Sequence, residues 1–403
     1  MKSVQFTPKR QIGVGGLTIS KLGKKYVNQV LASNRLSYGP FSQRFESEFA
    51  KEHSVKFASF MNSGTDALRI GLAAMKARFG WKDGDEVIVP AVTFVATANV
   101  VLQNNMKPVF VDVDSRTYNI NPEKIEEKIS KKTKAIIPVH LMGLPCEMDP
   151  IWIISKKYGL KILEDSCETM FATYKGKKVG SLGDIGAFST YVAHFLETGV
   201  GGLTTTSDPD LATDIKSLMN HGRDPAYLKI DDDRERDENE LYDVVRKRFS
   251  FVRLGYSSRC TEMEAALGLA HLKEKEKIIL GRRKIAERYT EGLKDIEEYL
   301  QLPFEPKDMT HMYMLYPIVL RRGSKQKLVN FLEKRNIETR ELMPILNQPI
   351  YIKMFGNLED QYPVAKWINQ SGFYIGCHQF LARAEQDYVI DQIHAYFTSI
   401  KKT

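Results

Sequence analysis

The chain has 403 residues, 43% of them hydrophobic, which is typical of a soluble globular protein with room for two domains. Its 58 basic and 50 acidic residues give a formal charge of +8, compatible with an anionic ligand, although most charges are expected to lie scattered over the surface. The N-terminus has no apolar run of signal-peptide length, and the most apolar stretch, residues 87–102, is interrupted by polar residues. We therefore expect a cytoplasmic protein without a membrane or nucleic-acid partner.

The four cysteines are spread along the chain at Cys146, Cys167, Cys260 and Cys377. No two of them form a C-x-C or C-x-x-C pair, so the sequence predicts neither a disulfide framework nor a metal or iron–sulfur site. Buried or unreactive thiols are the simpler interpretation.

Segments of helical and of strand periodicity alternate along the first half of the chain. Helices are expected over residues 24–33, 42–52, 67–77, 97–102, 150–158 and 209–219, with another opened by Asn121-Pro122. Strands are expected over residues 57–61, 86–89, 108–111, 135–139, 161–163 and 186–191. This alternation predicts a mainly parallel sheet with helices on both faces, and a long helix over 262–293 then leads to a C-terminal α+β portion.

The turn after the first strand contains Gly64, Thr65 and Asp66 and leads into the helix expected over residues 67–77. A strand, a turn of small residues and a helix gather free backbone amides at the positive end of a helix dipole, and this arrangement suits a phosphate. The same residue types also cap helices where no ligand binds, so the turn alone is a weak signal.

The stretch 162–206 carries polar residues at the ends of two apolar strands. The first strand ends in Glu164 and Asp165, and the second leads into Tyr191-Val-Ala-His194 and the glycine-rich loop 198–202. Because strand ends in an α/β sheet face the ligand crevice, this acid and this histidine are candidate site residues.

The spacing in this stretch resembles the DegT/DnrJ/EryC1/StrS sugar aminotransferases, which bind pyridoxal phosphate (PLP). That family carries ED-x-x-Q, GDxxxFSF, Y-x-x-K and TGEGG, and the matching frames here are 164–168, 183–189, 191–194 and 198–202. Residues 93–99 and 254–268 resemble the family's TFVATAN and LGYNxRMxExQAALG segments. The agreement of several motifs in order is much more specific than any one of them. The family lysine that holds PLP covalently is replaced by His194.

The resemblance implies a PLP-dependent transferase of fold type I, with a mainly parallel mixed sheet. It divides the chain into a large PLP-binding domain, residues 1–260, and a bridging helix with a small C-terminal α+β domain, residues 261–403; the N-terminal segment can pack on the small domain. It also implies a homodimer with active sites at the subunit interface.

The resemblance assigns cofactor roles to eight residues. Asp165 is expected to keep the pyridine nitrogen protonated, Phe94 to stack on the ring, and Ser189 to bind the phosphate with the turn Gly64, Thr65 and Asp66. Glu168 replaces a glutamine near the cofactor's 3-oxygen, so we expect protonation or a rearranged contact there. Ser257 replaces an asparagine that reaches the neighbouring subunit's cofactor phosphate. Taken singly, these residues have ordinary alternatives, such as a core phenylalanine or a solvated acid.

Three further residues, His221, Arg223 and Arg259, are candidates for binding a sugar diphosphate, although arginines are common on any surface. The run 231–240, DDDRERDENE, is longer and more charged than the family pattern, and we interpret it as a solvated loop.

Histidine at position 194 points to one branch of the family, the 3-dehydratases of nucleotide-linked 4-keto-6-deoxy sugars. Imidazole cannot replace the covalent lysine anchor, but it supplies a proton acceptor that ordinarily titrates near neutral pH. This branch would use pyridoxamine phosphate (PMP) and PLP, with His194 as the catalytic acid and base. Because no iron–sulfur motif is present, L-glutamate is the expected amino donor.

Two alternatives stay open on the sequence. One is an aminotransferase in which the lysine has been replaced, naturally or by engineering. The other is a non-catalytic protein that binds sugar nucleotides, an interpretation favoured by the departures at Glu168, Val200 and Ser257. The nucleotide and the stereochemistry of the sugar are not determined by the sequence.

Overall fold

The computed structural model describes residues 6–225, 238–247 and 249–401. Its central element is a seven-stranded sheet in the order β1-β9-β8-β5-β4-β2-β3. The strands are β1 Phe57–Met61, β2 Glu86–Pro90, β3 Lys107–Val111, β4 Thr133–Ile136, β5 Lys161–Asp165, β8 Ile185–Ser189 and β9 Gly202–Thr206. Strand β9 is antiparallel to both of its neighbours, and the remaining pairs are parallel. The expected mainly parallel mixed sheet is therefore confirmed.

The helices connecting these strands begin and end near the expected residues. They are α1 Lys21–Ser33, α2 Pro40–Glu52, α3 Gly64–Arg78, α4 Val95–Gln103, α5 Met148–Tyr158 and α6 Pro209–Met219. The helix expected after Asn121 is wrong: that segment forms two short 3-10 turns, η1 Pro122–Lys124 and η2 Glu126–Lys128. Asn121 does cap the first turn, but Ile129 already has extended backbone angles, so no longer helix forms.

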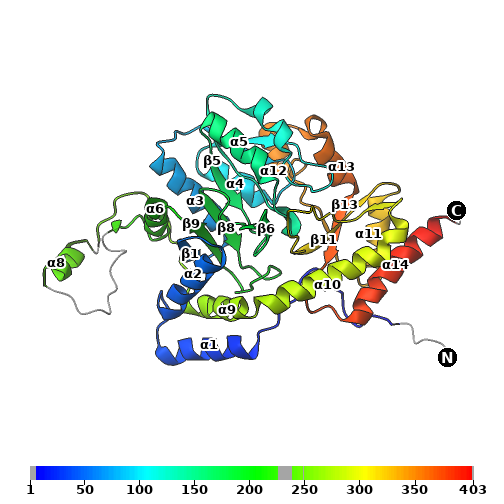
Figure 1. The fold of residues 1–403 in the computed structure, drawn as a ribbon, viewed down its shortest axis with the longest axis horizontal. Helices are drawn as coiled ribbons and strands as arrows, with labels where there is room; N and C mark the ends of the chain where they lie inside the picture. Colours follow the sequence, from blue (N-terminus) through cyan, green and yellow to red (C-terminus); the bar gives the residue numbers. More distant parts are fainter. Residues whose placement is uncertain (1–5, 226–237, 248, 402–403) are drawn as a thin grey trace.

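The C-terminal part contains a second sheet, which is antiparallel, in the order β10-β11-β13-β12. Its strands are β10 Leu300–Gln301, β11 Leu315–Leu320, β12 Thr339–Glu341 and β13 Gly372–Gly376. The helices of this part are α10 Lys275–Leu293, α11 Lys325–Glu333, α12 Pro349–Phe355, α13 Pro363–Ser371 and α14 Arg383–Lys401. Helices α10, α11 and α14 pack with this sheet around a hydrophobic cluster of their own (Figure 1).

The single long helix expected over 262–293 is two helices, α9 Glu262–Lys273 and α10. The break lies at Glu274, whose φ of −102° and ψ of 6° leave the helical region. Helix α9 packs on α1 and α2, whereas α10 packs on α14. The break therefore lets one continuous segment serve two different cores (Figure 1).

Residues before α1 lie on the C-terminal sheet. Ile12 forms a parallel bridge with Ile337, and its backbone N–H donates to the Asn336 carbonyl at 2.7 Å. The segment then crosses to the first sheet, where a Cβ on Gly15 would lie 2.4 Å from the Ala193 Cβ. The N-terminal segment thus contacts both parts of the molecule.

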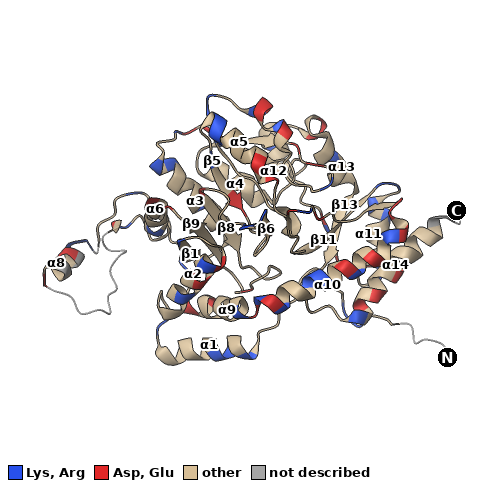
Figure 2. Cartoon of the chain, viewed as in Figure 1, with Lys and Arg blue, Asp and Glu red and all other residues tan. Residues whose placement is uncertain are grey.

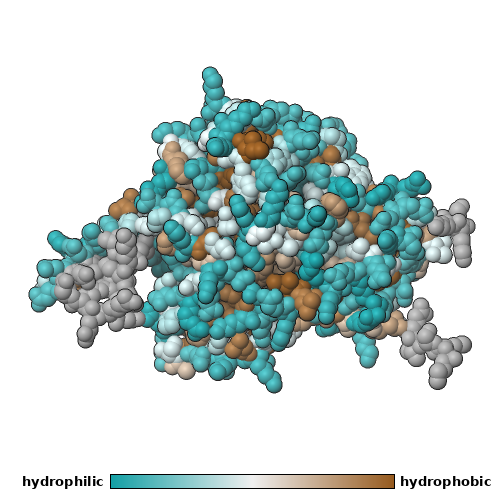
Figure 3. Space-filling model, viewed as in Figure 1, coloured by the Kyte–Doolittle hydropathy of each residue, from teal (hydrophilic) through white to brown (hydrophobic). Residues whose placement is uncertain are grey.

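The surface carries both signs of charge, interspersed along helices such as α10, α11 and α14 (Figure 2). The face shown in Figure 3 is mainly hydrophilic with small apolar patches. A short hairpin, β6 Thr173–Tyr174 and β7 Lys177–Lys178, follows β5, and α8 Glu238–Lys247 projects from the body (Figure 1). Residues 231–237 of the charged run 231–240 lie outside the described residues, and residues 238–240 begin α8. Within the described part, no helix has the length and apolar character needed to cross a membrane.

Candidate functional site

A cavity of about 440 Å³ lies at the ends of β5 and β8. Seven of the residues chosen from the sequence line it together: Gly64, Thr65, Phe94, Asp165, Glu168, Ser189 and His194. The C-terminal part adds Met314, Leu315, Met343 and Tyr374 to the wall. The cavity is therefore formed between the two parts of the chain. Its lining does not include the other chosen residues, Asp66, Ser257, His221, Arg223 and Arg259.

One end of the cavity is the N-terminus of α3. Ser63 caps this helix by accepting a hydrogen bond from the Asp66 backbone N–H at 3.1 Å, and Asp66 itself pairs with Arg69 at 2.7 Å. A Cβ on Gly64 would lie 2.7 Å from the Ser189 Cβ, so only glycine lets Ser189 approach the helix end. A hydroxyl beside a helix N-terminus fits a phosphate group, as the sequence suggested.

Asp165 lies at the end of β5, is 4% exposed and lines the cavity. Its carboxylate accepts hydrogen bonds from Thr97 Oγ1 at 2.7 Å and from the Cys167 backbone N–H at 3.2 Å. Burial raises the pKa of Asp165, and these two hydrogen bonds oppose the rise. Within the described residues it pairs with no lysine or arginine, which is unusual for a buried carboxylate. A protonated pyridine nitrogen in the cavity fits this position, because it would supply the missing positive charge.

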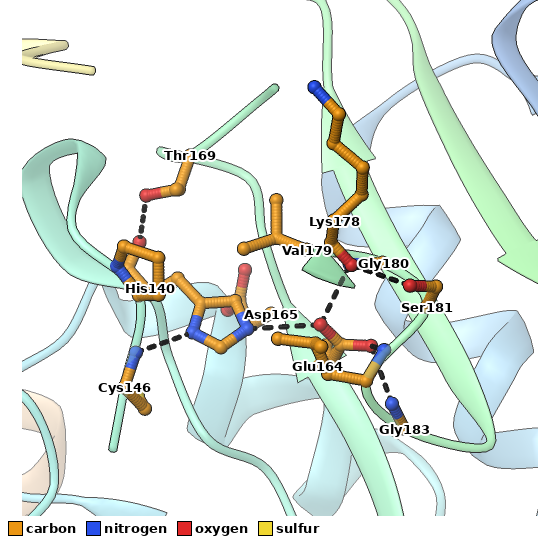
Figure 4. Close-up of polar contacts among 12 residues, drawn as sticks. His140, Cys146, Glu164, Asp165, Thr169, Lys178, Val179, Gly180, Ser181 and Gly183 are labelled. Atoms are coloured by element: carbon orange, nitrogen blue, oxygen red, sulfur yellow. Dashed lines mark hydrogen bonds and ion pairs between the residues drawn. The ribbon is translucent and has the colours of Figure 1, made fainter. Parts of the chain in front are cut away.

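Glu164, the residue before Asp165, points away from the cavity into a network that fixes the strand end (Figure 4). Its carboxylate and His140 Nε2 are 3.0 Å apart. It also accepts three backbone N–H bonds of 2.6–2.7 Å, from Gly180, Leu182 and Gly183. His140 Nδ1 accepts from the Cys146 N–H at 2.9 Å, so the proton of the neutral ring is on Nε2 and is donated to Glu164. The network therefore holds the chain on both sides of Asp165.

Glu168 lies beside Asp165 in the cavity wall and is 7% exposed. Its Oε2 accepts a hydrogen bond from the Met142 backbone N–H at 3.0 Å. Burial, with a smaller contribution from the negative charge of Asp165, raises the pKa of Glu168 to about 7, although the Met142 bond opposes this. A neutral carboxyl is thus accessible near physiological pH, and it can donate a hydrogen bond to an oxygen of the cofactor.

His194 follows β8 on a loop, and its ring lines the cavity. Nδ1 is buried and has no hydrogen-bond partner among the described residues. Burial lowers the pKa of His194 to about 4, and the positive charge of Arg282 acts in the same direction. The expectation of an imidazole poised near neutral pH is therefore wrong. At pH 7 the ring is neutral and free to accept a proton.

Phe94 stands at the start of α4 and lines the cavity, yet it remains 57% exposed. Tyr191 on the opposite loop is equally exposed. Such large apolar rings are usually covered, so their exposure at the cavity mouth indicates that a ligand or another chain packs there. A cofactor ring stacked on Phe94 would provide part of this cover.

The four remaining candidates form a group outside the cavity. Arg259 Nη2 lies 3.2 Å from His221 Nε2 and 3.3 Å from Ser257 Oγ. The Arg223 guanidinium lies 5.5 Å from the centre of the Phe251 ring. Their roles in binding a diphosphate, or a neighbouring subunit's cofactor phosphate, stay predictions.

Sequence reasoning did not identify several residues of the site. Thr97 was within a quoted motif but was not singled out; its hydroxyl bonds to that of Thr93, which precedes α4. Local sequence patterns do not predict tertiary contacts. Two were therefore missed: the hydrogen bond between His140 and Glu164, and the lining of the cavity by Met314 and Tyr374. Within the described residues, no cluster of His, Cys, Asp or Glu has the geometry of a metal site, and the cysteines form no disulfide.

Comparisons with known proteins identify the family of this chain. Residues 18–394 match the DegT/DnrJ/EryC1/StrS aminotransferase family. GDP-perosamine synthase of Escherichia coli O157:H7 is 32% identical, covering 93% of this chain and 95% of that protein. The dTDP-4-dehydro-2,6-dideoxy-D-glucose 3-dehydratase of Saccharopolyspora spinosa is also 32% identical, covering 89% and 80%.

Solved structures give the same result. E. coli GDP-4-keto-6-deoxy-D-mannose-3-dehydratase with bound hydrated PLP superposes with a TM-score of 0.85 at 28% identity, covering 95% of this chain and 99% of that one. The fold is thus that of PLP-dependent transferases, and the cofactor is PLP or PMP. The chain belongs to the DegT/DnrJ/EryC1/StrS aminotransferase family.

Proposed function

We propose that the protein catalyses the PLP/PMP-dependent removal of the C3 hydroxyl from a nucleotide-linked 4-keto-6-deoxyhexose. One observation carries the proposal: the described residues that line the cavity include His194 and no lysine. An aminotransferase of this family needs a lysine amine at that place, both to anchor the cofactor and to return a proton to C4 of the sugar. A neutral histidine can move a proton but cannot form the covalent anchor.

The residues present fit the cofactor. Asp165 would hold the pyridine nitrogen, Phe94 the ring face, and Ser189 with Gly64 and Thr65 the phosphate. When bound, PMP supplies an amine that condenses with the C4 ketone and a ring that takes up electrons. The buried carboxylate of Asp165 would keep that ring protonated.

His194 would carry the proton from one site of the reaction to the other. The neutral imidazole would remove a proton from the cofactor's C4′ carbon and become an imidazolium, which is a general acid. It then protonates the C3 hydroxyl, which leaves as water when the C3–O bond breaks. Positioned acid–base groups of this kind contribute about 10²–10⁴-fold to the rate.

We propose L-glutamate as the amino donor and a homodimer as the working unit. Over a complete cycle the sugar loses one oxygen atom, and glutamate becomes 2-oxoglutarate and ammonia. A related GDP-4-keto-6-deoxymannose-3-dehydratase, 28% identical with a TM-score of 0.85, has been solved with a trapped PLP–glutamate geminal diamine. This supports glutamate here.

The competing function is transamination of the same substrate class. It is favoured by relatives such as the GDP-perosamine synthases and a dTDP-3-amino-3,6-dideoxy-alpha-D-galactopyranose transaminase of Aneurinibacillus thermoaerophilus, which is 32% identical. A non-catalytic binding protein is a weaker alternative, because Asp165, Phe94 and Ser189 all keep their places around the cavity.

Product analysis separates these functions. The protein is incubated with PLP, glutamate and a panel of GDP-, CDP-, dTDP- and UDP-linked 4-keto-6-deoxy sugars, and the products are identified by mass spectrometry with an ammonia assay. We expect a 3-deoxy sugar, with ammonia equal to 2-oxoglutarate. A 4-amino sugar formed without ammonia would establish an aminotransferase instead, and binding without any product would favour the non-catalytic alternative.

Replacement of His194 tests its role directly. After borohydride reduction, the wild-type polypeptide should carry no covalently bound cofactor by mass spectrometry. The His194→Lys polypeptide should carry one cofactor, because the introduced amine can reach it. Dehydration should fall about 10²–10⁴-fold in both His194→Lys and His194→Ala. Wild-type dehydration rates in both variants would show that His194 is not the base.

A further inference from the structure

Helix α10 sends one arginine into the interior beside the site. Arg282 is completely buried, and its guanidinium reaches three segments that are far apart in sequence. Nη1 donates to the Met314 carbonyl at 2.6 Å and to the Cys377 carbonyl at 3.3 Å, at the ends of β11 and β13. Nη2 donates to the His194 carbonyl at 3.1 Å. One side chain therefore ties the loop of His194 to the C-terminal sheet.

The guanidinium of Arg282 makes no direct ion pair with an acidic side chain among the described residues. Glu197 is 1% exposed, and neither of its carboxylate oxygens has a hydrogen-bond partner among the described residues. Glu197 and Arg282 interact electrostatically without forming an ion pair, and the Arg282 guanidinium lies 4.9 Å from the centre of the Phe195 ring. Burying a guanidinium costs free energy, and its three hydrogen bonds to backbone carbonyls offset part of that cost.

The loop that Arg282 holds is itself constrained. Ala193, the residue before His194, has a φ of 82°, which is unfavourable for a residue with a Cβ. Gly15 packs against this alanine from the other side, since a Cβ on Gly15 would lie 2.4 Å from the Ala193 Cβ. Such a conformation persists only where neighbouring contacts determine it, and the Arg282–His194 bond is one of them.

We propose that Arg282 is a positioning residue, whose bond to the main chain of His194 holds the side chain at position 194 toward the cofactor. The proposal rests on the proposed function only in taking position 194 as the one that acts on the cofactor. A purely structural role, in which Arg282 only joins α10 to β11 and β13, is the alternative.

The neighbouring residue gives a matched control. Arg283 lies on the same helix, donates to the His311 carbonyl at 2.8 Å and pairs with Glu305 at 3.0 Å. It therefore also joins α10 to the segment that precedes β11, but it makes no hydrogen bond to the loop of His194. Arg283→Met removes structural contacts of the same kind while leaving that loop tied.

The test uses His194→Lys as a reporter, since capture of PLP by the lysine is seen by absorbance and by borohydride trapping, without turnover. The capture rate is measured in the full-length His194→Lys protein alone and combined with Arg282→Met, Arg282→Lys or Arg283→Met. Thermal midpoints and PLP affinity are recorded for each. The lysine at 282 keeps the charge but cannot span the three carbonyls, and it serves if the methionine variant fails to fold.

We expect the Arg282 variants to capture PLP about 10- to 100-fold more slowly, because a displacement of about 1 Å at a reacting group has effects of this size. The Arg283→Met combination should capture at the rate of His194→Lys. Equal rates in a folded Arg282 variant and in this control would overturn the inference and establish the structural role. No capture by His194→Lys alone would refute the placement of position 194, and with it both the proposed function and this inference.

Discussion

Three acidic side chains within five positions show how the environment of a residue, rather than its type, sets its role. Glu164 is saturated by four hydrogen bonds and holds the chain. Asp165 is buried, with two donors and no cationic partner among the described residues, and it faces the cavity. Glu168 has one donor, and its pKa is raised to about 7. Their spacing was visible in the sequence, but this division of roles was not.

Glu168 should make the stability of the cofactor-free protein depend on pH. Burial raises its pKa from 4.5 to about 7 on folding, so the folded state binds this proton more tightly than the unfolded chain does. The stabilisation is complete below pH 4.5 and is lost as the pH rises through about 7. Glutamine has no such proton. From pH 5 to pH 8, wild type should lose about 2–3 kcal/mol of unfolding free energy relative to Glu168→Gln.

Urea unfolding of the two proteins at several pH values measures this difference. Glu127→Gln, at an exposed carboxylate, is the control, and its difference from wild type should stay nearly constant with pH. A constant difference for Glu168→Gln as well would mean that Glu168 is ionised in the folded protein at neutral pH.

At the scale of elements, hydrophobic periodicity predicted six of the seven strands of the first sheet, all but β9, and helices α1 to α6 within a few residues. It failed at Asn121, which caps two 3-10 turns instead of a helix. It also failed at Glu274, where the structure breaks the helix although the hydrophobic pattern of the sequence continues. Both failures have the same cause: the direction of a segment is set by the core that it joins, and that core is assembled from residues distant in sequence.

The network around Glu164 yields a prediction for the end of β5. In Glu164→Gln an amide NH₂ must replace one carboxylate oxygen, and it would face two donors instead of accepting from them. Leaving two buried donors unsatisfied should lower the unfolding free energy by about 2–5 kcal/mol. The measurement is urea unfolding at pH 6.

The matched control is Glu168→Gln, the same substitution four residues away at a buried carboxyl with one N–H donor. At pH 6 this variant should not lose unfolding free energy, because the glutamine carbonyl can still accept from Met142 and the wild type has already lost part of the stabilisation that comes from the Glu168 proton. Equal losses in the two variants would show that the four bonds of Glu164 contribute no more than the single bond of Glu168.

For the molecule as a whole, the sequence predicted the fold class and seven residues that meet in one cavity. Their motifs follow β1, β2, β5 and β8, which run in the same direction, so the sheet brings their ends to one edge. The wall from Met314 and Tyr374 was not predicted, since it depends on how the second sheet packs on the first. The protonation of His194 was misjudged for a related reason: its burial and the nearby charge of Arg282 are properties of the assembled molecule.

The last prediction concerns the surface left outside the cavity. Leu254 is 97% exposed and Phe249 is 82% exposed, and both precede Ser257, the residue expected to reach a neighbouring subunit. Exposed apolar side chains close in sequence to a residue that is expected to contact a neighbouring subunit indicate a subunit interface. Light scattering should therefore give about twice the 46.0 kDa of one chain.

Leu254→Glu should shift this mass toward the monomer and weaken PLP binding, because the partner's Ser257 would be lost from the site. Ile153→Glu, at an exposed isoleucine on α5, should leave both the mass and PLP binding unchanged. A wild-type mass of 46.0 kDa at assay concentration would contradict the dimer. A Leu254→Glu variant that remains dimeric would show that Leu254 is not part of the dimer interface.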